Sequence, residues 1–162
     1  MSTRTNIHFN HGADIRANIY RHSDGYPGKV KNGVATEYGV LQDLLKFFRI
    51  LKAEVPDSRM GHAEYLAAKF LVWQSRELTQ YARVYKPAEG PVGEDGYGPT
   101  HPLQFLGVSP CIHDHGDIEY VYEVDCDNRD DEGFPVVRWK PADASRFKTV
   151  KLGTAAATKA VG

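Results

Sequence analysis

The stretch TNIHFNHGADIRANIYR, residues 5–21, alternates between apolar and polar side chains on both sides of a glycine-containing turn. In an extended chain Ile7 and Phe9 point to one side, and the polar residues beside them point to the other. A period of two around a short turn is typical of a β-hairpin. We therefore predict strands at residues 5–9 and 14–21.

A helical period follows the hairpin. Apolar side chains three or four residues apart form one stripe, which consists of Leu41, Leu44, Leu45, Phe48 and Leu51. Pro56 ends this pattern, and a second stripe of the same kind begins a few residues later. We predict helices near residues 40–54 and 60–81, and we expect them to pack as an antiparallel pair.

Two more strands are predicted in the last third of the chain. Residues 118–125 alternate again, the polar run 127–133 turns the chain, and residues 134–140 return as a second strand. Pro135 has no backbone N–H, so it places the last strand at a sheet edge or makes its start irregular. The predicted order is β-β-α-α-loop-β-β. This order favours an α+β fold, with one mainly antiparallel sheet and the helices packed on one face.

The chain has the length of one domain. Its 162 residues are enough to bury a core, and we assign residues 1–153 to a single domain. The small and polar residues 154–162 predict a disordered tail. Residues 86–117 are rich in glycine and proline and show no period, which is typical of a functional or mobile loop. Within it, we expect fast amide exchange at residues 87–100.

Composition narrows the class of protein. The net charge is −1, so no electrostatic field favours nucleic acid or an anionic membrane. Two cysteines, Cys111 and Cys126, are too few for a disulfide framework. No stretch approaches the roughly 20 apolar residues that cross a bilayer. We therefore expect a cytosolic protein, in a cell or in an infected host, and no pattern indicates a cofactor.

Two short motifs carry a resemblance to a known family. The first is Thr-Arg-Thr-Asn-Ile at residues 3–7, and the second is Ile-Tyr-Arg-His-Ser-Asp-Gly-Tyr-Pro at residues 19–27. Together with a strand like 118–125 and a final tryptophan-bearing strand like 134–140, they resemble a family of short phage and prophage proteins. This chain departs from the family pattern at Ser23, where tryptophan is usual, and in a longer glycine- and proline-rich stretch.

The resemblance covers about a third of the chain. It implies a mobile-element origin and a sheet-based fold. The family has no settled biochemical activity, so the resemblance transfers no catalytic residue to this sequence.

The second motif also predicts a binding site. Hairpin pairing would bring the start of the chain beside the end of the second strand. The predicted ligand- or partner-binding residues are Arg4, Arg21, His22, Asp24 and Tyr26. Such a basic and aromatic pocket suits a phosphate or carboxylate, and a His-x-Asp pair can also perform acid–base chemistry. The alternative is a structural turn, in which Gly25 adopts a positive φ.

A second candidate site has the spacing of metal ligands. His113, His115 and Asp117 share one face of an extended chain, and two imidazoles with a carboxylate can hold a divalent transition metal. The alternative is a histidine-rich polar loop.

The leading functional hypothesis is a phage or mobile-element accessory protein. It would act by binding and would block or sequester a host component such as a defence factor. The expected partner is a host or phage protein, a small anionic ligand is a further candidate, and the charge balance disfavours nucleic acid. The alternatives are a small metal-dependent hydrolase or nuclease and a phage structural or assembly component.

Overall fold

A computed structural model describes residues 2–32, 34–35, 38–84, 107–150 and 152 of the chain. The side chains of residues 34–35 and 76–84 lie outside this description. The elements in chain order are β1 (Thr5–His11), β2 (Asp14–Arg21), β3 (Val30–Lys31), β4 (Val34–Ala35), α1 (Val40–Glu54), α2 (Ala63–Val84), β5 (Val108–Pro110), β6 (Tyr120–Arg129), β7 (Pro135–Pro141) and β8 (Lys148–Val150).

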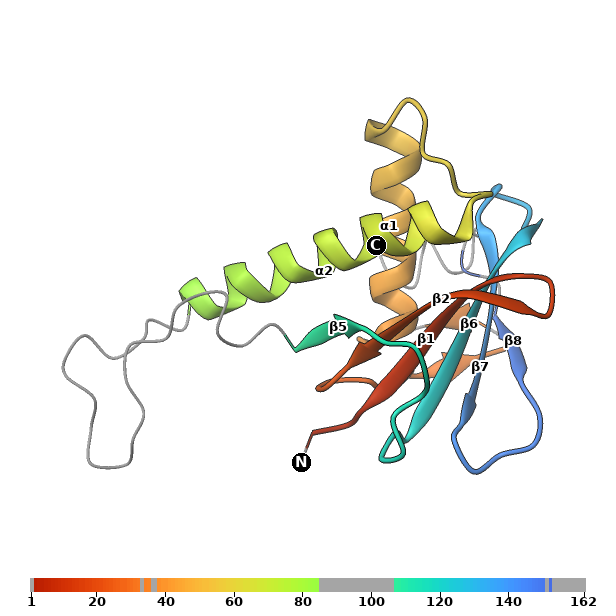
Figure 1. Ribbon diagram of the computed structural model, residues 1–162. Coiled ribbons are helices and arrows are strands. Elements are labelled where there is room, and N and C mark those ends of the chain that lie inside the picture. Colours follow the sequence, from red (N-terminus) through yellow and green to blue (C-terminus); the bar gives the residue numbers. More distant parts are fainter. Residues whose placement is uncertain (1, 33, 36–37, 85–106, 151, 153–162) are drawn as a thin grey trace.

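Six of these strands form one sheet in the order β5-β2-β1-β6-β7-β8 (Figure 1). Four of the five pairings are antiparallel, and β1 and β6 at the centre are parallel. The predicted α+β class with a mainly antiparallel sheet is therefore confirmed. The strand predicted at 118–125 lies in the same sheet as the one predicted at 14–21, as expected.

Four short strands were not predicted. β5 and β8 have three residues each and form the two edges of the sheet, and β3 pairs with β4 in a separate two-stranded sheet. A period of two needs four or more residues to be recognised in a sequence. Strands of two or three residues therefore leave no signal.

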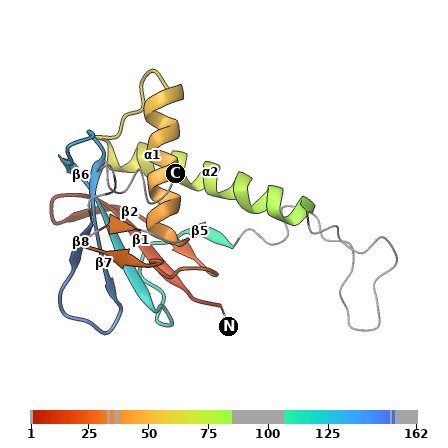
Figure 2. The ribbon, with the colours of Figure 1, turned by 180° about the vertical axis from the view of Figure 1, so that it is seen from behind.

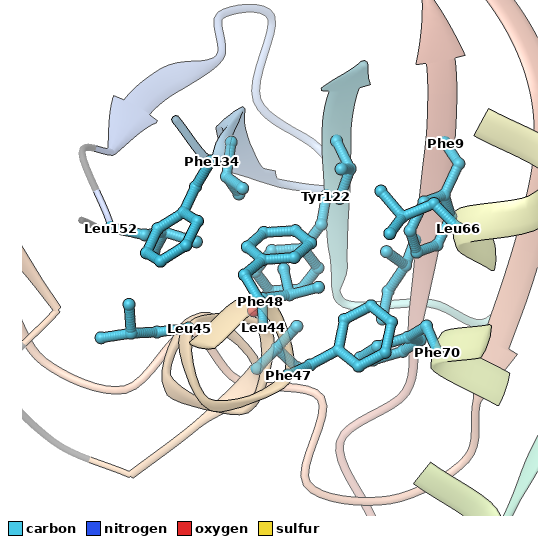
Figure 3. Close-up of a cluster of buried hydrophobic side chains, with 14 of the residues drawn as sticks. Phe9, Leu44, Leu45, Phe47, Phe48, Leu66, Phe70, Tyr122, Phe134 and Leu152 are labelled. Atoms are coloured by element: carbon cyan, nitrogen blue, oxygen red, sulfur yellow. The ribbon is translucent and has the colours of Figure 1, made fainter. Parts of the chain in front are cut away.

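Both helices cover the same face of the sheet, and the hydrophobic core lies between the helices and the strands (Figures 1 and 2). The predicted α1 is confirmed at its bounds, and α2 begins three residues later than expected and ends three later. The helices cross steeply, so the expected antiparallel arrangement was wrong (Figure 1). Their contact is aromatic: the ring centroids of Phe47 on α1 and Phe70 on α2 are 5.3 Å apart (Figure 3).

A buried ion pair connects the sheet to both helices. Arg21, at the end of β2, places its Nη1 atom 2.5 Å from Oδ2 of Asp43 on α1, and both side chains are more than nine-tenths buried. The same nitrogen donates to Oε1 of Gln74 on α2 at 3.2 Å. Its Nε atom donates to the carbonyl of Ser23 at 2.8 Å. One guanidinium thus fixes β2, both helices and the following turn.

Two expectations fall on parts of the chain that the structure does not describe. The fast amide exchange expected at residues 87–100 and the tail expected at residues 154–162 lie outside the described residues. Among the helices that are described, neither has the length and apolar character required to span a membrane.

The first prediction concerns Arg21. We expect Arg21→Met to lower the free energy of unfolding by about 3–5 kcal/mol, because the Asp43 carboxylate would remain buried without its partner. Urea denaturation followed by circular dichroism measures this change. The double variant Arg21→Met/Asp43→Leu should recover most of the loss, because it removes both charges.

Arg16→Met is the matched control for this experiment. Arg16 forms an exposed ion pair with Glu64, 2.7 Å apart, and exposed pairs contribute little to stability. An equal effect of the Arg16 and Arg21 substitutions would contradict a buried, structural role for Arg21.

Candidate functional site

Three polar side chains of β1 lie on the face of the sheet opposite the helices. Asn6, His8 and Asn10 alternate with the core residues Ile7 and Phe9, so they point away from the core. They are nevertheless buried, with exposed fractions of 0%, 6% and 1%. Polar groups that are cut off from water need hydrogen-bond partners. For two of them, Asn6 and His8, the partners come from the loop of residues 111–117, here called the Cys111–Asp117 loop.

Asp114 is the central contact of this loop with the sheet. Its Oδ1 atom lies 2.6 Å from Nε2 of His8 and accepts a hydrogen bond from Nδ2 of Asn18 on β2 at 2.8 Å. A carboxylate can only accept, so Nε2 of His8 carries the hydrogen in this contact. His8 and Asn18 are directly opposite each other in the β1–β2 pairing. One carboxylate oxygen therefore bridges the two strands.

Asn6 contacts the loop at two positions. Its Oδ1 atom accepts the backbone N–H of His115 at 3.1 Å, and its Nδ2 atom lies 3.1 Å from Sγ of Cys111. Nδ2 also donates to Oδ1 of Asn18 at 2.7 Å. The backbone N–H of Cys111 donates to the carbonyl of Asn18 at 3.0 Å. The loop is thus attached to the sheet at positions 111, 114 and 115.

Aromatic rings and a salt bridge complete the loop's attachment. The ring of His115 stacks on that of Tyr20 from β2, with centroids 3.7 Å apart and planes 10° from parallel. The Tyr20 hydroxyl lies 3.1 Å from Nδ1 of His22. At the end of the loop, Asp117 pairs with Arg4 at 2.5 Å. Burial and then the charge of Asp117 raise the pKa of Tyr20, so its hydroxyl stays protonated at neutral pH.

The His8–Asp114 pair has the residue types of a catalytic acid–base dyad, but the His8 ring is not accessible to a substrate. His8 is 94% buried, since its exposed fraction is 6%. Its second nitrogen, Nδ1, is closed to solvent and has no hydrogen-bond partner among the described residues. A general base must reach the proton that it removes. Cys111 is a poor nucleophile as well, because burial raises the pKa of its thiol. The pair is therefore best understood as an anchor for the loop.

The five residues of the predicted ligand site are not gathered at one surface. Arg21 is buried on the helix side of the sheet, whereas Arg4 contacts Asp117 on the open side. The expectation that these two arginines flank one pocket was wrong. Arg21 pairs with Thr5, and Arg4 precedes Thr5 in the chain. Because successive residues of a strand point to opposite faces, the two arginines lie on different sides of the sheet. His22 and Asp24 are exposed and Tyr26 is half-buried.

Gly25 shows the structural role of this motif. Its N–H donates to the carbonyl of Thr3 at 2.8 Å, and its own carbonyl accepts the hydroxyl of buried Tyr122 at 2.8 Å. The residue with positive φ is Asp24, at 54°, and not Gly25 as expected. Gly25 is required for a different reason: a Cβ atom there would lie 2.8 Å from the Thr3 carbonyl oxygen and from Cβ of Thr5. The motif therefore packs the turn against the start of β1.

The three residues with metal-ligand spacing have different surroundings. His115 stacks on Tyr20, Asp117 pairs with Arg4, and His113 is exposed. Among the described residues, no group of three or more histidine, cysteine, aspartate or glutamate side chains is arranged to hold a metal ion. The structure does not bring the three predicted ligands together.

Comparison with models of protein families, with curated proteins and with solved structures finds no match for this chain. The resemblance to phage and prophage proteins therefore stays an expectation from the two sequence motifs.

We predict that Gly25→Ala destabilises the fold by about 1–3 kcal/mol, because the added methyl group overpacks the contact with Thr3 and Thr5. Gly116→Ala is the control, since no atom lies within 4 Å of a Cβ placed there. Thermal unfolding of both variants measures the difference. Similar melting temperatures for the Gly25 variant and wild type would show that the turn is not packed as described.

A further prediction concerns the loop anchor. Asp114→Ala leaves His8 and Asn18 without their acceptor, and an unpaired buried donor costs about 1–3 kcal/mol. The loop should open more often, so Cys111 should react with a thiol reagent about tenfold faster for each 1.4 kcal/mol lost. Cys126 is an internal control, because burial raises its pKa to about 12 and keeps it unreactive.

Labelling followed by peptide mapping distinguishes the two thiols. An unchanged Cys111 rate would contradict the anchor role of Asp114. Faster labelling of Cys126 would show global unfolding instead of local opening.

Proposed function

We propose that this chain is a phage or mobile-element accessory protein that acts by binding, and that it blocks or sequesters a host protein, such as a defence factor, in the cytoplasm. The origin rests on the motifs at residues 3–7 and 19–27. The binding role rests on one observation: the Cys111–Asp117 loop is firmly attached to the sheet and yet exposes Ile112 to solvent.

Ile112 is 89% exposed, the largest exposure among the large hydrophobic side chains of the described residues. Single exposed apolar residues are common on protein surfaces and need no functional reason. Here, however, polar contacts at Cys111 before the tip and at Asp114 and His115 after it attach the loop to the sheet. A residue that is already ordered loses little entropy on binding, which increases affinity. An ordered apolar tip is therefore suited to insert into a pocket of a partner.

The surroundings of Ile112 resemble the rim of a protein interface. His113 and Asp114 follow it in the loop, and the Tyr20–His115 stack comes next. Protein interfaces commonly combine a buried centre that is enriched in apolar and aromatic residues with a polar rim. This composition supports a protein partner better than a small anionic ligand, since the nearby Arg4 is already paired with Asp117.

The alternative of a metal-dependent hydrolase or nuclease draws no support from the predicted triplet, because His113, His115 and Asp117 have separate surroundings. A structural or assembly role in a phage particle shares the binding chemistry of the leading proposal. The identity of the captured protein separates these two: a host protein supports the accessory role, and a capsid or tail protein supports assembly.

We predict that Ile112→Ser abolishes partner capture. It should not lower the melting temperature, because the Ile112 side chain is exposed to solvent in the free protein. Affinity purification from host lysate, followed by mass spectrometry, identifies proteins retained by wild type. Titration with the purified partner should then show at least tenfold weaker binding, about 1.4 kcal/mol.

Val72→Ser is the matched control, since Val72 on α2 is also exposed, at 60%. Capture that survives Ile112→Ser, or that is lost equally with Val72→Ser, would contradict the role of the loop tip.

A further inference from the structure

A cavity of about 340 Å³ lies beside β8, the last strand of the sheet. Its walls are formed by Gly28, Val30, Trp139, Lys148, Thr149 and Val150. Successive residues of a strand point to opposite faces. Lys148 and Val150 therefore point to the same face. Because Val150 and the neighbouring Trp139 of β7 belong to the hydrophobic core, the cavity lies on the core-facing side of β8, at the edge of the sheet. Val30 begins β3, so the cavity lies between β8 and the start of β3.

The outer edge of β8, which carries backbone hydrogen-bonding groups, lies next to this cavity. β8 pairs with β7 on one side, and within the described part of the chain no strand pairs with its other side. An unpaired strand edge is a template for a further extended segment. Peptide recognition by strand addition uses such an edge, with side-chain pockets next to it for specificity.

The charged residue in the cavity wall determines which extended segments can bind there. Lys148 is the one charged residue among the described residues of its wall, and no carboxylate lines it. The Nζ atom lies over the ring of Trp139, 5.0 Å from the centroid, so the ammonium group is held at the cavity. A lysine on an edge strand discourages indiscriminate pairing. It favours a strand that brings a carboxylate.

We propose that the cavity between β8 and β3 receives an extended peptide segment of a partner protein, which adds to the edge of β8 and places an acidic side chain beside Lys148. The three residues of β8 span about 10 Å at 3.3 Å per residue, so the recognised core is about three residues long. Val150 and the Trp139 ring share a face with Lys148, so together with Val30 they provide apolar contacts for the side chains two positions before and after the acidic residue. This surface is separate from the Ile112 loop, and either can fail without the other.

The test uses two synthetic peptides, acetyl-Val-Thr-Glu-Thr-Val-amide and its counterpart with lysine in place of glutamate. In a titration followed by nuclear magnetic resonance, the glutamate peptide should shift the backbone amide signals of residues 148–150 and the Trp139 indole signal in a saturable way. It should bind at least tenfold more tightly than the lysine peptide. Methylation of its backbone nitrogens should abolish binding, because the added strand loses its donors.

Charge reversal gives the sharpest control. Lys148→Glu should invert the preference, so that the lysine peptide binds at least tenfold more tightly than the glutamate peptide. Lys46→Glu is the matched variant, because Nζ of Lys46 also lies 5.0 Å from an aromatic centroid, that of Tyr38, away from the cavity. It should leave the preference unchanged.

Three results would overturn the proposal: equal binding of the two peptides, binding that survives backbone methylation, or shifts confined to residues far from β8. Sedimentation that shows a dimer dissociated by Lys148→Glu would also overturn it, because a second copy of the chain would then be the occupant.

Discussion

Buried polar side chains on β1 determine how the open face of this protein is built. Asn6 and His8 lie on the side of the sheet opposite the helices, where solvent would normally satisfy them. The Cys111–Asp117 loop covers them instead, and Asp114 and the backbone of His115 supply their hydrogen bonds. Opening the loop would leave these groups without their protein partners. The conformation of the exposed loop is therefore a consequence of residues in the centre of the sheet.

The two faces of the sheet have different roles. On the helix side, aromatic packing and the Arg21–Asp43 ion pair hold the fold together, and the Asp-Gly-Tyr-Pro turn belongs to this side through Gly25 and Tyr122. On the open side, polar contacts position a loop whose tip, Ile112, is free to contact a partner. This separation explains why substitutions at the loop tip should change binding while leaving the melting temperature unchanged. Substitutions in the turn should do the opposite.

Most of the fold followed from side-chain periodicity, because long strands and helices bury one face and leave the other exposed. The candidate site could not be predicted from this periodicity. Alternation placed Asn6 and His8 opposite the core residue Ile7, which normally means exposure to solvent, and no local pattern indicated that a loop 100 residues later would cover them. The same long-range packing pulled His115 onto Tyr20 and away from a shared metal site. The role of Gly25 also depends on a tertiary contact, its close approach to Thr3.

The central claim is that the exposed Cys111–Asp117 loop is fixed to the sheet by the side chains beneath it, and the backbone amide of His115 tests this most directly. His115 is an exposed residue outside any strand or helix, yet its N–H donates to the buried Oδ1 atom of Asn6. Native-state hydrogen exchange, resolved by nuclear magnetic resonance, should show strong protection of this amide. Exchange at the rate of an unstructured peptide would contradict the account.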